Sequence, residues 1–119
     1  MIDHISLRVT NFERSKKFYA EALKPLGYVV IRDFPETCGL GAGGKPDFWI
    51  TQTESTIPSH VAFLAGSRKV VDAFHAAALA AGGKDFGEPG KREYHEHYYG
   101  AFVLDPDGHN IEAVIHKPE

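Results

Sequence analysis

The chain has 119 residues, of which 43% are hydrophobic and 24% charged, and its formal net charge is −3. These values predict one globular domain with a core of ordinary size, and the mild charge excludes the basic stripe of a nucleic-acid-binding protein. No apolar run approaches the roughly 20 residues of a membrane helix, and Cys38 is the single cysteine, so we expect a cytoplasmic protein with no membrane partner, no export signal and no internal disulfide.

The first half of the chain predicts a strand, a helix and further strands. Polar and apolar side chains alternate along residues 2–9, which places His4 and Ser6 on the same face of a strand. Thr10 and Glu13 have the spacing of a capping box, in which the Thr10 hydroxyl accepts the N–H of residue 13 and starts a helix. A strand, a glycine-rich turn or bulge and another strand follow at residues 28–31, 39–44 and 47–52.

The second half of the chain repeats the first with an offset of 56 residues. This offset carries His4 onto His60, Phe18 onto Phe74 and Gly27 onto Gly83. One helix can cover only one face of a four-stranded sheet, so the uncovered faces of the two copies are expected to enclose a cup. The sequence therefore predicts an α+β fold, a single domain of residues 1–119, in which two βαβββ modules, 1–53 and 58–116, form a curved mixed sheet.

A hairpin over residues 101–116 contains the most informative pattern. Asp105 to Gly108 has the composition of a tight turn, and in the returning strand Asn110, Glu112, Val114 and His116 share one face. A glutamate in mid-strand is costly to bury unless a positive group meets it. His4 and His60 lie early in strands of the same style, so two imidazoles and one carboxylate could converge on a divalent metal.

Further candidates fall close to this carboxylate, each with a structural alternative. His95 and His97 are candidate general acids or bases, or exposed imidazoles of a loop. Tyr98 and Tyr99 could donate hydroxyl hydrogen bonds to a substrate or pack within the sheet. Trp49 is expected to line the cavity. Ser6 faces the same way as His4 and could bind a metal-bound water.

The chain resembles the vicinal oxygen chelate superfamily, which includes glyoxalase I, extradiol dioxygenases and bleomycin-binding proteins. The residues that carry the resemblance are Ile2-Asp3-His4, Phe18-Tyr19, Ser59-His60-Val61, Asp105-Pro106-Asp107-Gly108 and Ile111-Glu112. The resemblance implies that His4, His60 and Glu112 bind a divalent metal, which could be Fe, Mn, Zn, Ni or Co. Trp49 stands at the fourth ligand position of glyoxalase I and cannot bind a metal.

The resemblance also implies a function and a partner. It implies a lyase, isomerase or ring-cleaving dioxygenase that acts on a small substrate with vicinal oxygens. Together with the candidates from the residue pattern, the catalytic candidates are Glu112, His95, His97 and Tyr99. Phe102 falls where extradiol enzymes carry an acid–base tyrosine, so Tyr98 or Tyr99 would take that role, and Ser6, Trp49, Tyr98 and Phe102 would line the substrate pocket. The alternative is a metal-free protein that sequesters a drug or metabolite. A homodimer is expected, with the cup formed either within one chain or between exchanged modules.

Overall fold

Two copies of one strand–helix–strand–strand–strand unit make up the protein. A computed structural model describes all residues, Met1–Glu119. The first module contains β1 (Ile5–Val9), α1 (Phe12–Ala22), the 3-10 helix η1 (Lys24–Leu26), β2 (Val29–Asp33), β3 (Thr37–Gly41) and β4 (Phe48–Gln52). The second contains β5 (His60–Leu64), α2 (Arg68–Ala80), β6 (Lys84–Lys91), β7 (Tyr99–Leu104) and β8 (Asn110–Ile115).

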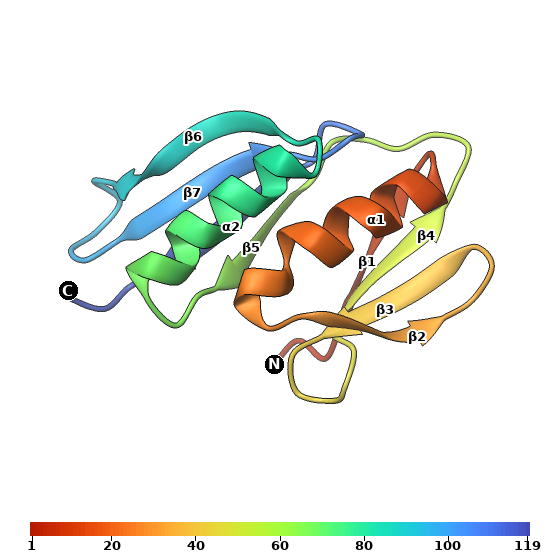
Figure 1. Ribbon diagram of the computed structural model, residues 1–119, viewed down its shortest axis with the longest axis horizontal. Coiled ribbons are helices and arrows are strands. Elements are labelled where there is room, and N and C mark those ends of the chain that lie inside the picture. The colour runs from red at the N-terminus through yellow and green to blue at the C-terminus, as the bar shows by residue number, and fades with distance from the viewer.

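Each module has its own four-stranded mixed sheet. The strand order is β1-β4-β3-β2 in the first sheet and β5-β8-β7-β6 in the second. The first and last strands of each module pair in parallel, and the other pairs are antiparallel. Both helices lie on the same side of the two sheets, next to each other (Figure 1). The predicted α+β fold of two modules is confirmed. Neither helix has the length and hydrophobicity that crossing a bilayer requires.

One hydrophobic core joins the two modules. Alternate strand residues face the helices, and the resulting cluster contains 21 buried residues drawn from both halves of the chain. The ring of Phe48 contacts Tyr19 of α1 edge to face at 5.0 Å and Phe63 of β5 at 5.1 Å. Side chains on the other face of the sheets, such as Ser6 and Ala62, are exposed. The helices therefore cover one face of each sheet and leave the other open, as the pattern predicts.

The strand register confirms the internal repeat. Ser6 lies opposite Trp49 in the β1–β4 pair, and Ala62 lies opposite Glu112 in the β5–β8 pair. The offset of 56 residues that relates His4 to His60 also relates Ser6 to Ala62. Trp49 and Glu112 therefore occupy equivalent positions in the two sheets.

Helix α1 begins differently from the prediction. Asn11 is its N-cap, and the Asn11 side chain accepts the backbone N–H of Arg14 at 3.2 Å. The predicted capping box at Thr10 and Glu13 is wrong, because the N–H and the hydroxyl of Thr10 both donate to the Asp107 carboxylate in the other module.

The bounds of the glycine-rich segment and of the first strand also differ from the predicted bounds. Gly39 to Gly41 belongs to strand β3, so the predicted turn begins only at Ala42. A Cβ atom at Gly39 would lie 2.8 Å from the indole of Trp49, so the glycine allows a close approach within the sheet and does not mark a turn. The first strand begins at Ile5, which leaves His4 just outside it.

The turn between β7 and β8 is built around a buried carboxylate. Asp105 is 5% exposed, and its Oδ1 atom accepts the backbone N–H groups of Asp107 at 2.9 Å and His109 at 2.8 Å. The Tyr19 hydroxyl of α1 donates to Oδ2 at 2.5 Å. Burial and the Asp105 charge raise the pKa of Tyr19 well above its usual value, so this hydroxyl remains a donor.

His109 connects three segments from both modules. Its Nδ1 accepts the backbone N–H of Ser59 at 2.9 Å, and its Nε2 donates to the carbonyl of Arg8 in β1 at 2.9 Å. The ring is fully buried. The Ser59 N–H and the Arg8 carbonyl together require one tautomer, the one protonated at Nε2. His109 therefore has a structural role that the sequence analysis did not identify.

We predict that Tyr19→Phe lowers the free energy of unfolding by about 1–3 kcal/mol, because the buried Asp105 carboxylate loses one of its donors. Tyr28→Phe is the matched control. The Tyr28 hydroxyl donates to the exposed Asp47 carboxylate at 2.8 Å, which water can solvate in its place. Urea denaturation of the two variants measures the difference. If both variants lose the same free energy of unfolding, the Tyr19–Asp105 hydrogen bond stabilises the fold no more than the exposed Tyr28–Asp47 hydrogen bond does.

Candidate functional site

Glu112 lies in the middle of β8 with its side chain on the open face of the second sheet. Its neighbours across the sheet are Ala62 on β5 and Phe102 on β7. Although this face is open, Glu112 is only 2% exposed. Gly100 makes room for the carboxylate, since a Cβ atom there would lie 3.1 Å from Glu112 Oε2. A buried carboxylate of this kind requires hydrogen-bond donors or a cation nearby.

His60 is the first partner of this carboxylate. The His60 Nε2 atom lies 3.1 Å from Glu112 Oε1, and the His60 Nδ1 atom lies 3.0 Å from the carbonyl oxygen of Asn110. A carbonyl can only accept, so Nδ1 carries a proton. When His60 is neutral, Nε2 therefore presents a lone pair to the carboxylate. This arrangement is satisfied when a proton or a cation lies between Nε2 and Oε1.

Tyr98 is the second partner. It precedes β7, and its hydroxyl donates to Glu112 Oε2. Burial and this hydrogen bond raise the pKa of Tyr98 above its usual value, so the hydroxyl remains a donor near neutral pH. The Phe102 ring stacks on His60, with 6.2 Å between the ring centroids. The structure thus brings together His60, Tyr98, Phe102 and Glu112.

The other candidates of the second module divide between the two faces of the sheet. His95 stacks on His116 with 4.7 Å between ring centroids and contacts the edge of Tyr98 at 5.1 Å. His97 lies in the loop before β7, 3.6 Å from the carboxylate of Glu96. Tyr99 points the opposite way, and its hydroxyl donates to Asp72 of α2 at 2.7 Å.

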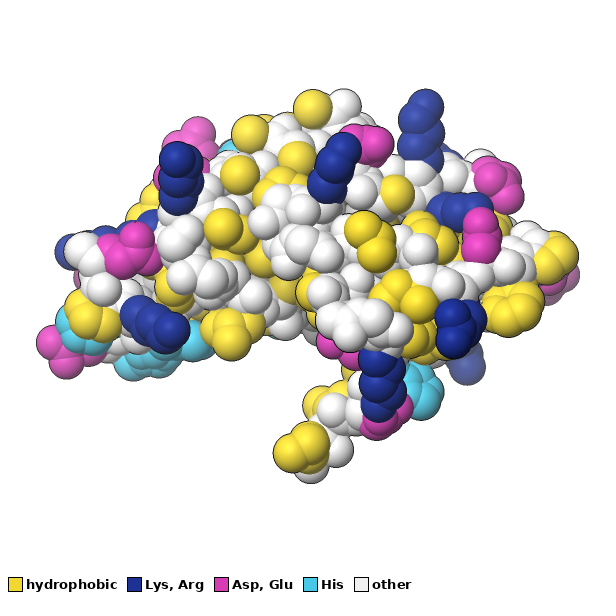
Figure 2. All heavy atoms as spheres, turned by 60° about the horizontal axis from the view of Figure 1, so that its bottom comes forward, with side chains coloured by type: hydrophobic (Ala, Val, Ile, Leu, Met, Phe, Trp, Pro, Cys, Tyr) yellow, Lys and Arg dark blue, Asp and Glu magenta, His cyan; other side chains and the backbone are white.

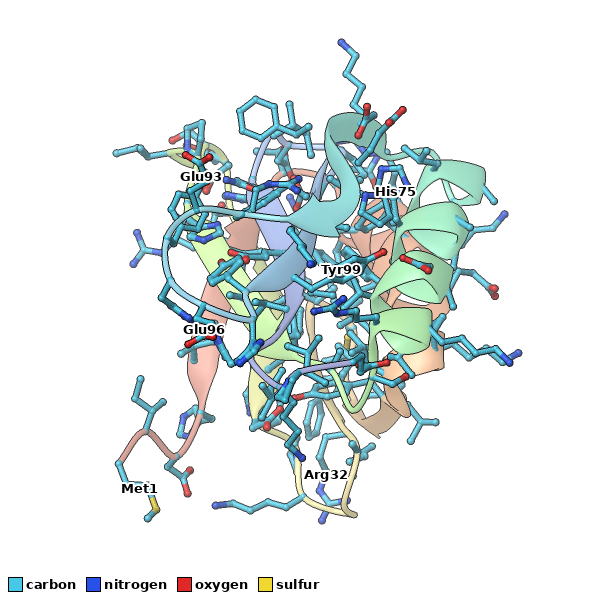
Figure 3. The ribbon with its side chains drawn as sticks, turned by 90° about the vertical axis from the view of Figure 1, so that its left-hand side faces the viewer. Met1, Arg32, His75, Glu93, Glu96 and Tyr99 are labelled. Atoms are coloured by element: carbon cyan, nitrogen blue, oxygen red, sulfur yellow. The ribbon has the colours of Figure 1, made fainter.

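Figure 3 shows this division. Tyr99 lies between the sheet and α2, whereas Glu93 and Glu96 mark the loop on the other side of the sheet. Tyr98, and not Tyr99, therefore reaches Glu112. His116 shares the face of Glu112, which the strand alternation predicts, but the sequence analysis did not connect His116 with His95.

The candidates of the first module lie apart from Glu112. His4 is about half exposed and pairs with Asp3 at 2.7 Å, and Asp3 also binds Lys45. Hydrogen bonds from Lys45 and His4 lower the pKa of Asp3. No three His, Cys, Asp or Glu side chains of the chain come together in a way that could hold a metal. Figure 2 shows histidine side chains beside the projecting N-terminal segment and a separate group of them at the lower left of the view.

Ser6 and Trp49 lie on the open face of the first sheet. The Ser6 hydroxyl is 3.3 Å from that of Thr51, and the Trp49 indole packs over Gly39. Trp49 is partly buried, which suits a wall residue. One chain therefore carries two separate half-sites, one with His4, Ser6 and Trp49 and one with His60, Tyr98, Phe102 and Glu112.

Comparison with known proteins gives a consistent picture. The family model described as the Glyoxalase/Bleomycin resistance protein/Dioxygenase superfamily matches residues 1–113. No curated protein matches the chain. A glyoxalase/bleomycin resistance protein from Albidiferax ferrireducens T118 is 31% identical, covers 98% of each chain and superposes with a TM-score of 0.82.

Two more distant structures share the fold. A glyoxalase/bleomycin resistance protein/dioxygenase family enzyme from Burkholderia phytofirmans PsJN is 20% identical, with 98% of each chain covered and a TM-score of 0.74. Lactoylglutathione lyase from Agrobacterium tumefaciens is 15% identical, with 97% of this chain and 92% of that chain covered and a TM-score of 0.72.

If Glu112 binds a divalent cation, we predict that Tyr98→Phe weakens retention of that cation by about 10–100-fold, because Tyr98 would be the outer partner that orients the carboxylate. Tyr99→Phe is the matched control, since it removes the neighbouring hydroxyl on the other face of the sheet. Equilibrium dialysis against Mn²⁺ with elemental analysis measures both. If the two variants retain Mn²⁺ as the wild type does, Tyr98 does not support a metal ligand.

Proposed function

The chain belongs to the Glyoxalase/Bleomycin resistance protein/Dioxygenase superfamily, and from this premise we propose that it is a metal-dependent enzyme acting on a small substrate with vicinal oxygens. One observation carries the proposal. The Nε2 atom of His60 and Oε1 of the buried Glu112 carboxylate face each other at 3.1 Å, with His60 Nδ1 committed to a carbonyl. An imidazole nitrogen and a carboxylate oxygen are ligands that suit Fe, Mn, Zn, Ni or Co.

His60 and Glu112 fit such a metal, and they supply two of the three ligands in the proposal. His60 and Glu112 are already oriented by their outer partners, the Asn110 carbonyl and the Tyr98 hydroxyl. The third ligand in the proposal is His4, which comes from the first module. When bound, the cation would polarise the oxygens of the substrate.

In this proposal Phe102 of the second half-site contacts the substrate, and His95, whose ring lies against the edge of Tyr98, moves protons. The Phe102 ring forms an apolar wall next to His60. His95 Nδ1 donates to the carbonyl of Glu96 at 2.8 Å, which leaves Nε2 of a neutral ring free to take up a proton. His95 is thus the best placed general base among the predicted catalytic residues. Assays with hemithioacetals and catechols distinguish a lyase or isomerase from a ring-cleaving dioxygenase. In each assay the enzyme must lose its activity when EDTA is added.

A homodimer is part of the proposal. His4 is separated from the His60–Glu112 pair within one chain, and β1 and β5 each have a partner strand on only one side. A second copy that presents its first module to the second module of this chain would supply His4 and Trp49 to the same cup. This arrangement corresponds to the exchanged form of the dimer. The cytoplasmic location remains a prediction from the single cysteine.

The alternative function is a metal-free protein that sequesters a small molecule. The observation that favours it is the Tyr98–Glu112–His60 chain of contacts, which is satisfied without a metal when His60 is protonated. Elemental analysis of protein purified without chelator distinguishes the two functions. A tightly held metal supports the enzyme, whereas protein that stays free of metal after incubation with each candidate cation supports the sequestering protein.

We predict that Glu112→Gln loses the metal almost completely. The amide keeps the shape of the side chain but removes the charge, so the loss should exceed the about 10–100-fold expected for an outer partner. Glu93→Gln, in the exposed loop before β7, is the matched control. Unchanged metal content in Glu112→Gln would argue against this carboxylate as a ligand.

We further predict that two defective variants complement each other. His4→Ala and Glu112→Gln should each lose the metal alone. After the two are unfolded, mixed and refolded together, a mixed dimer has one site with an intact His4, His60 and Glu112, so metal binding is partly restored. If the cup forms within a single chain, every site in the mixture remains defective and no metal binding returns.

A further inference from the structure

A small hollow adjoins the His60–Glu112 pair on the open face of the second sheet. Its volume is about 220 Å³, and it is lined by Phe86, Gly87, Arg92, Tyr94, Phe102 and Asn110. Phe102 is shared, because its ring forms a wall of the hollow and also stacks on His60 at 6.2 Å. A group that occupies the hollow therefore lies next to His60.

Arg92 is held in a defined position at this hollow. Its Nη2 donates to the carbonyl of Glu88 at 2.7 Å and its Nη1 to that of Lys91 at 3.2 Å. Its Cζ atom lies 5.4 Å from the centre of the Phe102 ring. Cβ atoms at Gly87 and Gly90 would each lie 3.2 Å from the guanidinium, so these two glycines leave the space that it fills.

The charge of Arg92 is not neutralised within the chain. None of the ion pairs of the structure involves Arg92, and its hydrogen bonds go only to backbone carbonyls. A guanidinium has five N–H donors in a planar fork, so donors remain for an anionic group. A carboxylate matches this fork because it can accept two parallel hydrogen bonds.

The remaining walls favour a flat aromatic ring. Phe86 is 58% and Tyr94 is 69% exposed, which is high for aromatic side chains that line a hollow. The amide oxygen of Asn110 has no hydrogen-bond donor in the chain but is itself buried, so it adds no contact to a ligand in the hollow. The volume is below the about 300–1,000 Å³ of sites for drug-sized ligands. It therefore suits a single ring rather than a larger molecule.

We propose that this hollow is a subsite for an aromatic carboxylic acid, with Arg92 binding the carboxylate and Phe86, Tyr94 and Phe102 contacting the ring. Only one part of this inference rests on the proposed function, namely that the bound acid is part of the enzyme's substrate. Binding to the subsite itself needs no metal, since none of its residues is a proposed metal ligand.

The test is the binding of benzoate to the full-length protein in the presence of EDTA, followed by amide chemical shifts in NMR. We expect the shifts to centre on Gly87, Arg92 and Phe102. We also expect benzamide, which has the same shape without the charge, to bind at least about 10-fold more weakly, because a charge-assisted pair is lost. Absence of binding, equal affinity for acid and amide, or shifts centred elsewhere would overturn the proposal.

Two variants identify the arginine. Arg92→Gln should reduce affinity for the acid to that for the amide, whereas Arg32→Gln, which removes an exposed arginine of β2, should leave the affinity unchanged. If Arg92→Gln fails to fold, Arg92→Lys keeps the charge without the fork and should bind the acid with reduced affinity. Wild-type affinity in Arg92→Gln, or in Arg92→Lys where that variant replaces it, would overturn the assignment. Metal content measured on the same samples reports separately on the His60–Glu112 pair, so either proposal can fail while the other stands.

Discussion

The buried carboxylate of Glu112 is the constraint on which the second module depends. An ionised carboxylate in the middle of a strand needs partners for both oxygens. Oε1 faces the imidazole of His60 and Oε2 accepts from Tyr98, while Gly100 leaves the space that this approach requires. The equivalent position in the first module holds Trp49, which needs no charged partner. The two sheets therefore share a fold but differ in chemistry, since one has a buried carboxylate where the other has an indole.

The network around the β7–β8 turn holds the two modules together. Asp105 accepts from Tyr19 of α1, and His109 donates to Arg8 of β1. The side chains of Tyr19, Asp105 and His109 are buried, so each unmade bond would cost free energy. The same turn starts β8, the strand that carries Glu112. The Asp-Pro-Asp-Gly motif thus has a structural role, since it fixes β8 relative to the first module and does not itself enter the proposed site.

The fold could be predicted from the sequence because alternation along strands and the repeat at 56 residues are strong local signals. His60 and Glu112 follow from the same alternation. The choice of Tyr98 over Tyr99 could not be predicted, because it depends on where β7 begins and a shift of one residue reverses the face. The role of His109 and the loss of the predicted capping box at Thr10 depend on contacts with the other module, which no local pattern records. Whether His4 comes close to Glu112 depends on how the first module of one chain packs against the second module of the same or another chain, which the sequence does not specify.

We propose that His60 and Glu112 are two ligands of one metal ion. Anomalous diffraction from crystals grown with Mn²⁺ locates such an ion. We expect a manganese peak bonded to Nε2 of His60 and to the carboxylate of Glu112, with the imidazole of His4 from a second copy completing the set. Manganese bound at full occupancy elsewhere, with none between His60 and Glu112, would contradict it.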